Sequence, residues 1–176
     1  MAERKGDWMQ TYTGRAFWPM DPRPEEICIE DIAHALSHIC RYVGHCVRFE
    51  SVAEHSVLLY KAVPPELKKP ALLHDAPEAY IVDLPRPIKP FIRAYKYLER
   101  DVAEAIQTKF GVPNIYPKEL AEYDTRILLD EQQQNMAPPP MPWGMQDMEP
   151  LGVKLEFWSP QVAEIMFLAA FREAFA

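Results

Sequence analysis

The stretch that decides the fold is Pro70-Ala71-Leu72-Leu73-His74-Asp75-Ala76-Pro77-Glu78. Pro70 suits the first position of a helix, and the apolar run after it predicts that this helix is buried. Pro77 lacks the backbone N–H that a helix needs and crowds the carbonyl four residues earlier, so the helix should kink or restart just after Asp75. His74 and Asp75 therefore stand at the apolar end of a helix, where polar groups cost free energy unless they are paired or bind a metal.

Apolar residues recur at helical spacing in further segments on both sides of this stretch. The segments that we predict to be helical are 29–43, 51–63, 91–110, 117–134 and about 159–175. Ser51 and Glu54 form an S-x-x-E capping box at the start of the second helix, and Gly111 is a typical C-cap for the helix before it. Ser159-Pro160 supplies an N-cap and a first helical residue for the last one.

Two segments between the helices are rich in proline, which disfavours helix. Residues 8–26 and 135–158 are therefore expected to be irregular, the first of them ordered because it carries Phe17 and Trp18. The sequence has no convincing alternation of apolar and polar residues of the kind that is typical of β-strands, although residues 153–155 can make one short extended piece. These patterns predict an all-α fold, a compact helical bundle that spans residues 1–176 as a single domain.

The composition narrows the possible partners. The 176 residues carry a net charge of −7, which argues against binding a nucleic-acid polymer, whereas a small anionic substrate needs only local cations or a metal. The first residues lack the apolar core of a signal peptide, and the sequence has no apolar run long enough to span a membrane. Three cysteines in such a chain indicate reduced thiols, so we expect a cytoplasmic protein.

Candidate metal ligands fall on three of the predicted helices. His55 lies in the middle of the capped helix, Asp124 lies among apolar residues of the 117–134 helix, and His74 with Asp75 ends the helix described first. Taken alone, a polar pair at the end of a helix would simply meet water. Ligands that converge from three helices, however, are how bundles build metal sites, and imidazole with carboxylate suits a divalent transition metal.

Together these motifs resemble the HD-domain phosphohydrolase superfamily. The matching segments are Ala53-Glu54-His55-Ser56, Leu72-Leu73-His74-Asp75-Ala76-Pro77-Glu78, Asp83-Leu84-Pro85 and Asp124, and the similarity runs from about Thr11 to Glu131. Within the superfamily the chain is similar to bacterial 5′-deoxynucleotidases and to phage triphosphohydrolases that remove dATP. The order H…HD…D is specific, whereas either half alone would be weak.

The resemblance implies a metal centre and its proton-handling groups. One divalent ion, zinc, cobalt or manganese, would be held by His55, His74, Asp75 and Asp124, and an additional magnesium ion would accompany a triphosphate substrate. Glu78 would accept a proton from the attacking water or orient it, and Asp83 would lie beside the scissile phosphate. The alternative for Asp83 is a turn residue before Leu84-Pro85.

The resemblance also implies substrate-binding residues. Arg41 would bind phosphate through its two-pronged guanidinium, and Lys89 would reach the distal phosphates. Tyr42 would stack on the base or sugar, with core packing as its alternative. Trp18 and Met20 would shape an adenine pocket, unless Trp18 only anchors the N-terminal segment to the core.

Two histidines of the first helical segment complete the set of cations that a triphosphate needs. His38 precedes Arg41 on the polar stripe of the predicted 29–43 helix, and His45 continues the stripe if the helix runs on past Gly44. A structural zinc site offers another interpretation, with the ligands His38, Cys40, His45 and Cys46. It is disfavoured because Cys40 falls on the apolar face and because the spacing misses the usual C-x2-C pattern.

These residues predict a metal-dependent phosphohydrolase. The leading hypothesis is a dNTP triphosphohydrolase that favours dATP and releases deoxynucleoside and triphosphate, and the alternative is a 5′-deoxynucleotidase that acts on dNMPs. An inactive nucleotide-binding or interaction module with the same fold is a hypothesis of another class. We expect a homo-oligomer that binds a small deoxynucleotide, in the cytoplasm of a bacterium or of a phage-infected host.

Overall fold

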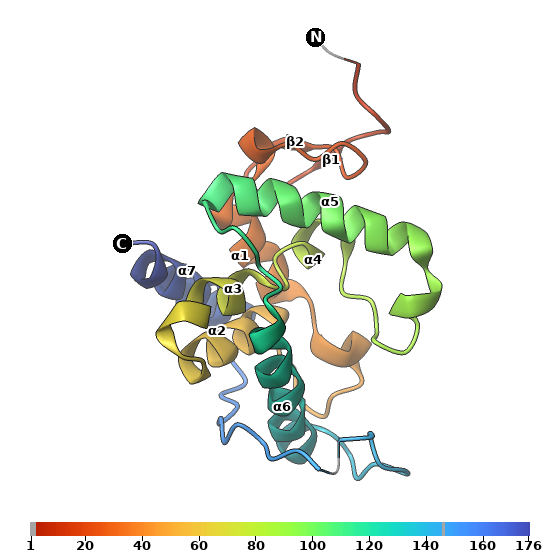
Figure 1. Cartoon of the computed structure of the whole chain (residues 1–176), viewed down its shortest axis with the longest axis vertical. Coiled ribbons are helices and arrows are strands. Elements are labelled where there is room, and N and C mark those ends of the chain that lie inside the picture. Colours follow the sequence, from red (N-terminus) through yellow and green to blue (C-terminus); the bar gives the residue numbers. More distant parts are fainter. Residues whose placement is uncertain (1–2, 146) are drawn as a thin grey trace.

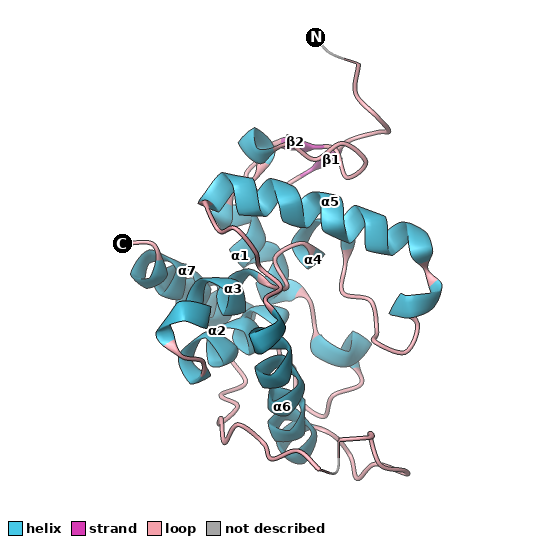
Figure 2. Ribbon diagram, in the orientation of Figure 1, coloured by secondary structure: helices cyan, strands magenta, loops and turns pink. Residues whose placement is uncertain are grey.

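A computed structural model describes residues 3–145 and 147–176, and these residues are mostly helical, as predicted (Figures 1 and 2). The helices are α1 (Ile29–His38), α2 (Val52–Ala62), α3 (Lys68–Leu73), α4 (Glu78–Ile81), α5 (Arg93–Phe110), α6 (Lys118–Asn135) and α7 (Pro160–Ala174). Short 3₁₀ turns lie at Pro24–Glu26, Arg41–Gly44, Pro65–Leu67 and Lys89–Phe91. Two strands, β1 (Met9–Gln10) and β2 (Ala16–Phe17), pair antiparallel. Within the described residues no helix is both long and apolar enough to cross a membrane.

The main apolar core lies where the last helix meets the first ones. Helix α7 packs against α1, α2 and α3, and α5 contacts α4 and is drawn below the β1–β2 hairpin in Figure 1. Phe167 of α7, Ile32 of α1 and Val57 of α2 are fully buried in this core. Each such side chain contributes about 1.5–3 kcal/mol to stability.

A second, smaller core joins α6 to the rest of the fold. Leu59 of α2, Ala71 of α3 and Ile127 of α6 are buried there, together with Leu155 from the extended segment before α7. Helix α6 lies in the lower part of Figure 1 and contacts α2 along this second core. The packing therefore brings one face of α2 and the turn after α3 toward α6.

The predicted helix ends are largely confirmed. The Ser51 hydroxyl accepts a hydrogen bond from the Glu54 N–H, and the Ser159 hydroxyl accepts one from the Val162 N–H. Gly111 ends α5 in the left-handed conformation, with φ of 65°. The predicted break after Asp75 is also present, because α3 ends at Leu73 and α4 restarts at Glu78, although α3 begins two residues before Pro70.

The second arm of the predicted capping box has a different role. In a capping box the Glu54 side chain would return to the backbone of Ser51. Instead the fully buried Glu54 carboxylate accepts three hydrogen bonds, of 2.7–2.8 Å, from backbone N–H groups of the segment before α7. The donors are residues 156–158. Glu54 thereby fixes the entry of the chain into α7.

The predicted helix over 29–43 is wrong in its second half. Helix α1 ends at His38, and the next residues turn back to pair with the start of α2: Cys40 bridges Ser51, and the Arg41 N–H donates to the Glu50 carbonyl at 2.9 Å. Arg41 and His45 therefore do not continue a helical stripe from His38. Helical spacing persists in the sequence to Val43, but pairing with the chain before α2 overrides it.

The N-terminal segment contains a hairpin that the sequence did not predict. Strands β1 and β2 have two residues each, too few for a period of two to stand out. The turn between them is tied to α1, because the Asp31 carboxylate accepts from the Thr13 N–H at 2.7 Å and from its hydroxyl at 3.0 Å. The segment is thus ordered, as predicted. The described part of 135–158 is irregular, as predicted, and residue 146 lies outside the described residues.

Candidate metal centre

Three of the predicted ligands converge from three parts of the fold. His55 is fully buried in the middle of α2, His74 follows α3 directly, and Asp124 lies on α6. One ligand atom from each lies within 4.8 Å of the others. The group His55, His74 and Asp124 can therefore bind a metal ion.

The atoms of this group fit a divalent transition metal. Asp124 Oδ1 lies 3.3 Å from His55 Nε2 and 3.5 Å from His74 Nε2. Both Nε2 atoms are buried, and neither finds hydrogen-bond geometry with any partner in the described chain. A buried polar atom left without a partner is costly, and two imidazoles with a carboxylate are typical zinc ligands.

Asp75, the fourth predicted ligand, faces the same point. Its Oδ2 lies 3.2 Å from His74 Nε2 and 3.7 Å from His55 Nε2. Burial alone would raise the pKa of Asp75, but the neighbouring His74 and His55 hold it well below its usual range. Asp75 is thus an ionised carboxylate beside the other three side chains.

The outer ring nitrogens of both histidines are engaged by protein atoms. His74 Nδ1 lies 2.8 Å from the Ala71 carbonyl, to which it can only donate, so its Nε2 is left as the lone-pair atom when the ring is neutral. His55 Nδ1 lies 2.5 Å from Oε1 of Glu131 on α6. Both rings therefore present Nε2 to the candidate metal centre.

Glu131 is a residue of this site that the sequence analysis did not single out. It is fully buried and also accepts hydrogen bonds from Arg41 Nη2, at 2.8 Å, and from the Tyr42 hydroxyl. Burial would raise the pKa of Glu131, but the charges of Arg41 and His55 outweigh it and hold the pKa below the ordinary value. One signal was present in the sequence: Glu131 follows Asp124 by seven residues, which puts both on one face of a helix.

The predicted proton-handling residues lie beside the ligands. Glu78 begins α4 and is buried, and burial together with the charges of Asp75 and Asp83 raises its pKa well above the ordinary value. Asp83, two residues after α4, has its pKa raised by burial and by the charge of Asp75. Both carboxyls thus share one electrostatic environment with a predicted metal ligand.

Lys89 lies next to Glu78, but a closer carboxylate holds it. Its Nζ is 3.7 Å from Glu78 Oε1 and 2.6 Å from Glu99 Oε1 on α5. Burial opposes the charge of Lys89, but the hydrogen bond to Glu99 and the charge of Glu78 keep its pKa above the usual value. The structure thus places Lys89 beside the candidate base as a charged group.

Arg41 and Tyr42 also reach the centre. The Arg41 side chain is buried between two carboxylates, with Nη1 4.0 Å from Asp75 Oδ2 and Nη2 2.8 Å from Glu131. Its Nε has no hydrogen-bond partner within the part of the chain that the structure describes. The Tyr42 ring packs 5.8 Å from the Trp143 ring, between centroids, while its hydroxyl is bound to Glu131.

The two histidines predicted as extra cations, His38 and His45, lie outside the candidate metal centre. The His38 ring packs on the His34 ring, and its Nδ1 lies 2.8 Å from the His34 carbonyl within α1. His34 in turn lies 3.0 Å from Glu164 of α7. His45 is exposed at the end of the 3₁₀ turn, so neither histidine joins the ligand group.

The predicted adenine-pocket residues lie in the N-terminal segment. The Arg4 guanidinium covers the Trp18 ring at 4.1 Å, and the Trp8 ring lies 6.5 Å away. Met20 is 42% exposed and lines a shallow hollow with Asp101 of α5. These contacts fit the alternative role of Trp18, as an anchor of the N-terminal segment.

The alternative zinc site receives no support from the geometry. The thiols of Cys40 and Cys46 lie 3.5 Å apart. Within the described residues, however, His38 and His45 do not complete a group of ligand atoms with them.

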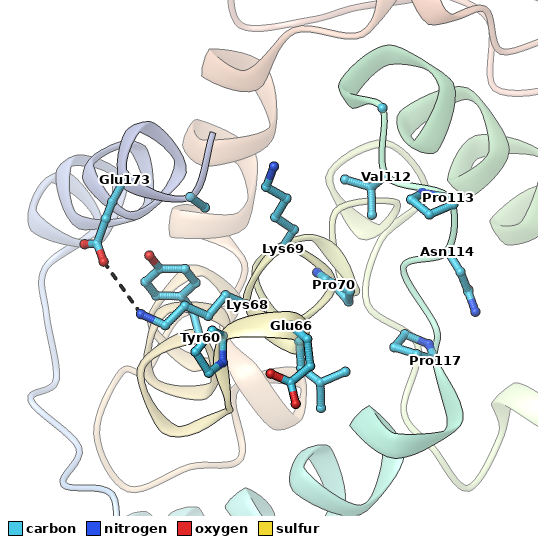
Figure 3. A pocket seen from close by; sticks show the side chains of 14 residues that line it. Tyr60, Glu66, Lys68, Lys69, Pro70, Val112, Pro113, Asn114, Pro117 and Glu173 are labelled. Atoms are coloured by element: carbon cyan, nitrogen blue, oxygen red, sulfur yellow. Dashed lines mark ion pairs between the residues drawn. The ribbon is translucent and has the colours of Figure 1, made fainter. Parts of the chain in front are cut away.

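A separate cavity of about 610 Å³ lies between α3, the end of α5 and the end of α7 (Figure 3). Tyr60, Lys68, Lys69 and Val112 line it, and Lys68 Nζ lies 3.6 Å from Glu173 across its edge. Among the described residues that line the cavity, none is a predicted site residue. The cavity and the candidate metal centre are therefore different places on the molecule.

The fold and the ligand group define a mostly helical protein with a possible metal centre. No family model matches the chain. The chain belongs to the family of the uncharacterized protein YfdR of Escherichia coli strain K12, with 38% identity over 124 residues, 70% of each chain. It is also 37% identical to an uncharacterized protein of Rhodobacter capsulatus. This match extends over 123 residues, which are 64% of this chain and 63% of that relative.

Proposed function

We propose that the chain is a metal-dependent phosphohydrolase of the HD type that acts on the 5′-phosphate end of a deoxynucleotide. The observation that carries the proposal is the convergence of His55, His74, Asp75 and Asp124, with both Nε2 atoms buried and, among the described residues, without hydrogen-bond partners. The resemblance of the HD motif and its flanking residues supports the same activity.

The residues of the chain divide the chemistry between them. A bound divalent ion would polarise a phosphoryl oxygen and lower the pKa of a water molecule. Arg41 would hold the substrate phosphate through Nη1, because Nη2 is committed to Glu131. Glu78, whose pKa is raised by burial and by the charges of Asp75 and Asp83, would accept a proton from water and return it to the leaving group.

Two reactions compete within this proposal. Release of triphosphate from a dNTP, dATP above all, is favoured by the resemblance, by the buried cation Arg41 and by the part-exposed cation Lys89 near the ligands. Hydrolysis of a dNMP is favoured by a specific observation: Arg41 and Lys89 are each paired with a glutamate, and His38 contacts its own helix. A monophosphate needs fewer cations than a triphosphate does.

Product analysis of the full chain separates these reactions. The protein would be stripped with a chelator, reloaded with cobalt, manganese or zinc, and given each dNTP and dNMP. We expect triphosphate from dATP, and we expect Asp75→Ala to abolish it. Asp147→Ala, which makes the same change at an exposed aspartate, serves as the matched control.

The other outcomes have definite meanings. Orthophosphate from dNMPs alone would assign the chain as a 5′-deoxynucleotidase. Metal binding and nucleotide binding without turnover would make it an inactive binding module. Turnover that is insensitive to the chelator and to Asp75→Ala would contradict the proposal.

A further inference from the structure

The Glu131 carboxylate gathers three donors from two separate parts of the chain. His55 on α2 lies 2.5 Å from Oε1, and Arg41 Nη2 lies 2.8 Å from Oε2, while the Tyr42 hydroxyl donates to the same Oε2. Glu131 itself has no exposed surface. If the carboxylate is removed, the three donors therefore lose their acceptor at a place that bulk water does not reach.

One consequence concerns the orientation of the His55 ring. An ionised carboxylate only accepts hydrogen bonds, so His55 Nδ1 must carry the hydrogen that points at Glu131. In the neutral ring, Nε2 is then the atom with the lone pair, and it faces Asp124 at 3.3 Å. A carboxylate behind a metal-binding histidine also fixes the ring in place and raises its basicity.

A second consequence concerns the turn that carries Arg41. Tyr42 and Val43 have φ of 54° and 56°, a left-handed conformation that residues other than glycine rarely adopt and that is rarest for β-branched ones. Such a turn persists only where other contacts hold it. The bonds of Arg41 and Tyr42 to Glu131 are contacts of this kind, and they leave Arg41 Nη1 directed at Asp75 at 4.0 Å.

We propose that Glu131 is a positioning residue that sets both His55 and the Arg41–Tyr42 turn. It holds the Nε2 face of His55 toward the other ligands, and it keeps the guanidinium of Arg41 beside them. Affinity for metal and the conformation of the turn thus depend on one carboxylate. The part that concerns phosphate rests on the proposed function, whereas the part that concerns His55 and the turn does not.

The test compares Glu131→Gln with Glu119→Gln, which changes an exposed glutamate of the same helix. Chelator-stripped proteins would be titrated with zinc, and amide hydrogen exchange would be followed at residues 41–44. We expect Glu131→Gln to weaken zinc affinity by about 10–100-fold, the usual effect of losing a group behind a ligand, and to speed exchange in the turn. The control should match the wild type in both measurements.

A second variant separates the two consequences. Tyr42→Phe removes one donor to Glu131 and leaves His55 in place. It should speed exchange at residues 41–44 while zinc affinity stays within about twofold of the wild type. An equal loss of zinc affinity in Tyr42→Phe and Glu131→Gln would contradict the direct action of Glu131 on His55.

A measurement on the wild type keeps the proposal falsifiable if Glu131→Gln does not fold. Long-range ¹H–¹⁵N spectra report which ring nitrogen of His55 carries hydrogen, and we expect Nδ1 to carry it. An Nδ1 without hydrogen, or unchanged zinc affinity in a folded Glu131→Gln, would overturn the proposal.

If zinc affinity falls in Glu131→Gln but the wild type turns over no nucleotide, the positioning role stands and the proposed function fails. If the wild type is active, Glu131→Gln should also show a higher KM for the nucleotide than the wild type does.

Discussion

The packing of α7 against α1 and the polar part of the junction between α2 and α6, around His55 and Glu131, are built from opposite chemistry. At the first, Phe167 and Ile32 are fully buried among apolar neighbours. At the second, His55 and Glu131 are just as fully buried, but they lie against one another and against charged groups. Apolar packing tolerates many substitutions of similar volume, whereas a buried polar network fails when one partner is lost.

This comparison leads to different expectations for the two regions. Substitutions in the α1–α7 packing should lower the free energy of unfolding and leave the properties of the candidate metal centre intact in the molecules that remain folded. Substitutions in the polar part of the α2–α6 junction should change the metal affinity or the orientation of the ligands.

The largest expected effect lies on the apolar side. Phe167→Ala should lower the free energy of unfolding by about 3–5 kcal/mol, because it removes a fully buried ring and leaves a cavity. Chemical denaturation would measure this loss, with Phe167→Leu as a milder control. Zinc affinity of the folded fraction should match the wild type, and a parallel loss of affinity would break the separation between the two regions.

The next effect is a change in the free energy of zinc binding, which we expect when a metal ligand is replaced. Asp124→Asn keeps the shape of the side chain but removes the charge that faces both histidines. Zinc affinity should fall by more than about 100-fold, beyond the effect of residues that only orient ligands. Calorimetric titration would show this, and a loss below tenfold would mean that Asp124 is not a ligand.

Glu54 tests a buried polar contact that lies outside the candidate metal centre. Glu54→Gln places an amide where three backbone N–H groups converge, and one of its own hydrogens then opposes them. We expect a loss of about 1–3 kcal/mol in unfolding free energy, measured by denaturation, with zinc affinity unchanged. Glu104→Gln, at an exposed position of α5, is the matched control.

The last expected effect is a dependence of stability on pH at Glu50. Burial and the charge of Glu131 raise the pKa of Glu50 to about 8 in the folded chain, from an unfolded value of 4.5. The folded state therefore binds more protons between these values, so the Glu50 contribution is fully present below the unfolded pKa and is lost as the pH rises toward 8. Glu50→Gln resembles the protonated acid at every pH.

The melting temperatures of wild type and Glu50→Gln should thus agree near pH 4.5 and separate as the pH rises. At pH 8 the variant should melt higher than the wild type, because the wild-type chain is then ionising a buried carboxyl. Thermal denaturation monitored by circular dichroism would measure the difference. A gap that stays the same or narrows as the pH rises would contradict the raised pKa of Glu50.

The sequence predicted those parts of the fold that local chemistry decides. Ser51 and Ser159 begin helices because their hydroxyls accept early N–H groups, and Gly111 ends one because glycine adopts positive φ without strain. The convergence of His55, His74 and Asp124 was also predicted, since bundles bring buried helix faces together. The helix ends need no knowledge of distant partners, whereas the convergence was inferred from the way in which bundles pack.

The features that the sequence did not reveal depend on contacts between distant segments. Helix α1 ends at His38 although helical spacing continues, because the next residues pair with the chain before α2. Glu131 follows another acid, Asp130, and resembles a solvated helix surface until its partner Arg41, 90 residues earlier, is placed against it. Local pattern could not distinguish these cases from their commoner alternatives.

The most direct test of the account is the metal content of the wild-type chain. Protein loaded with zinc and freed of excess ion would be measured by elemental analysis, beside Asp124→Asn prepared in the same way. The account predicts about one ion per wild-type chain, as a single four-ligand centre requires, and none retained by the variant. A wild-type chain that retains no ion, or a variant that retains as much, would contradict it.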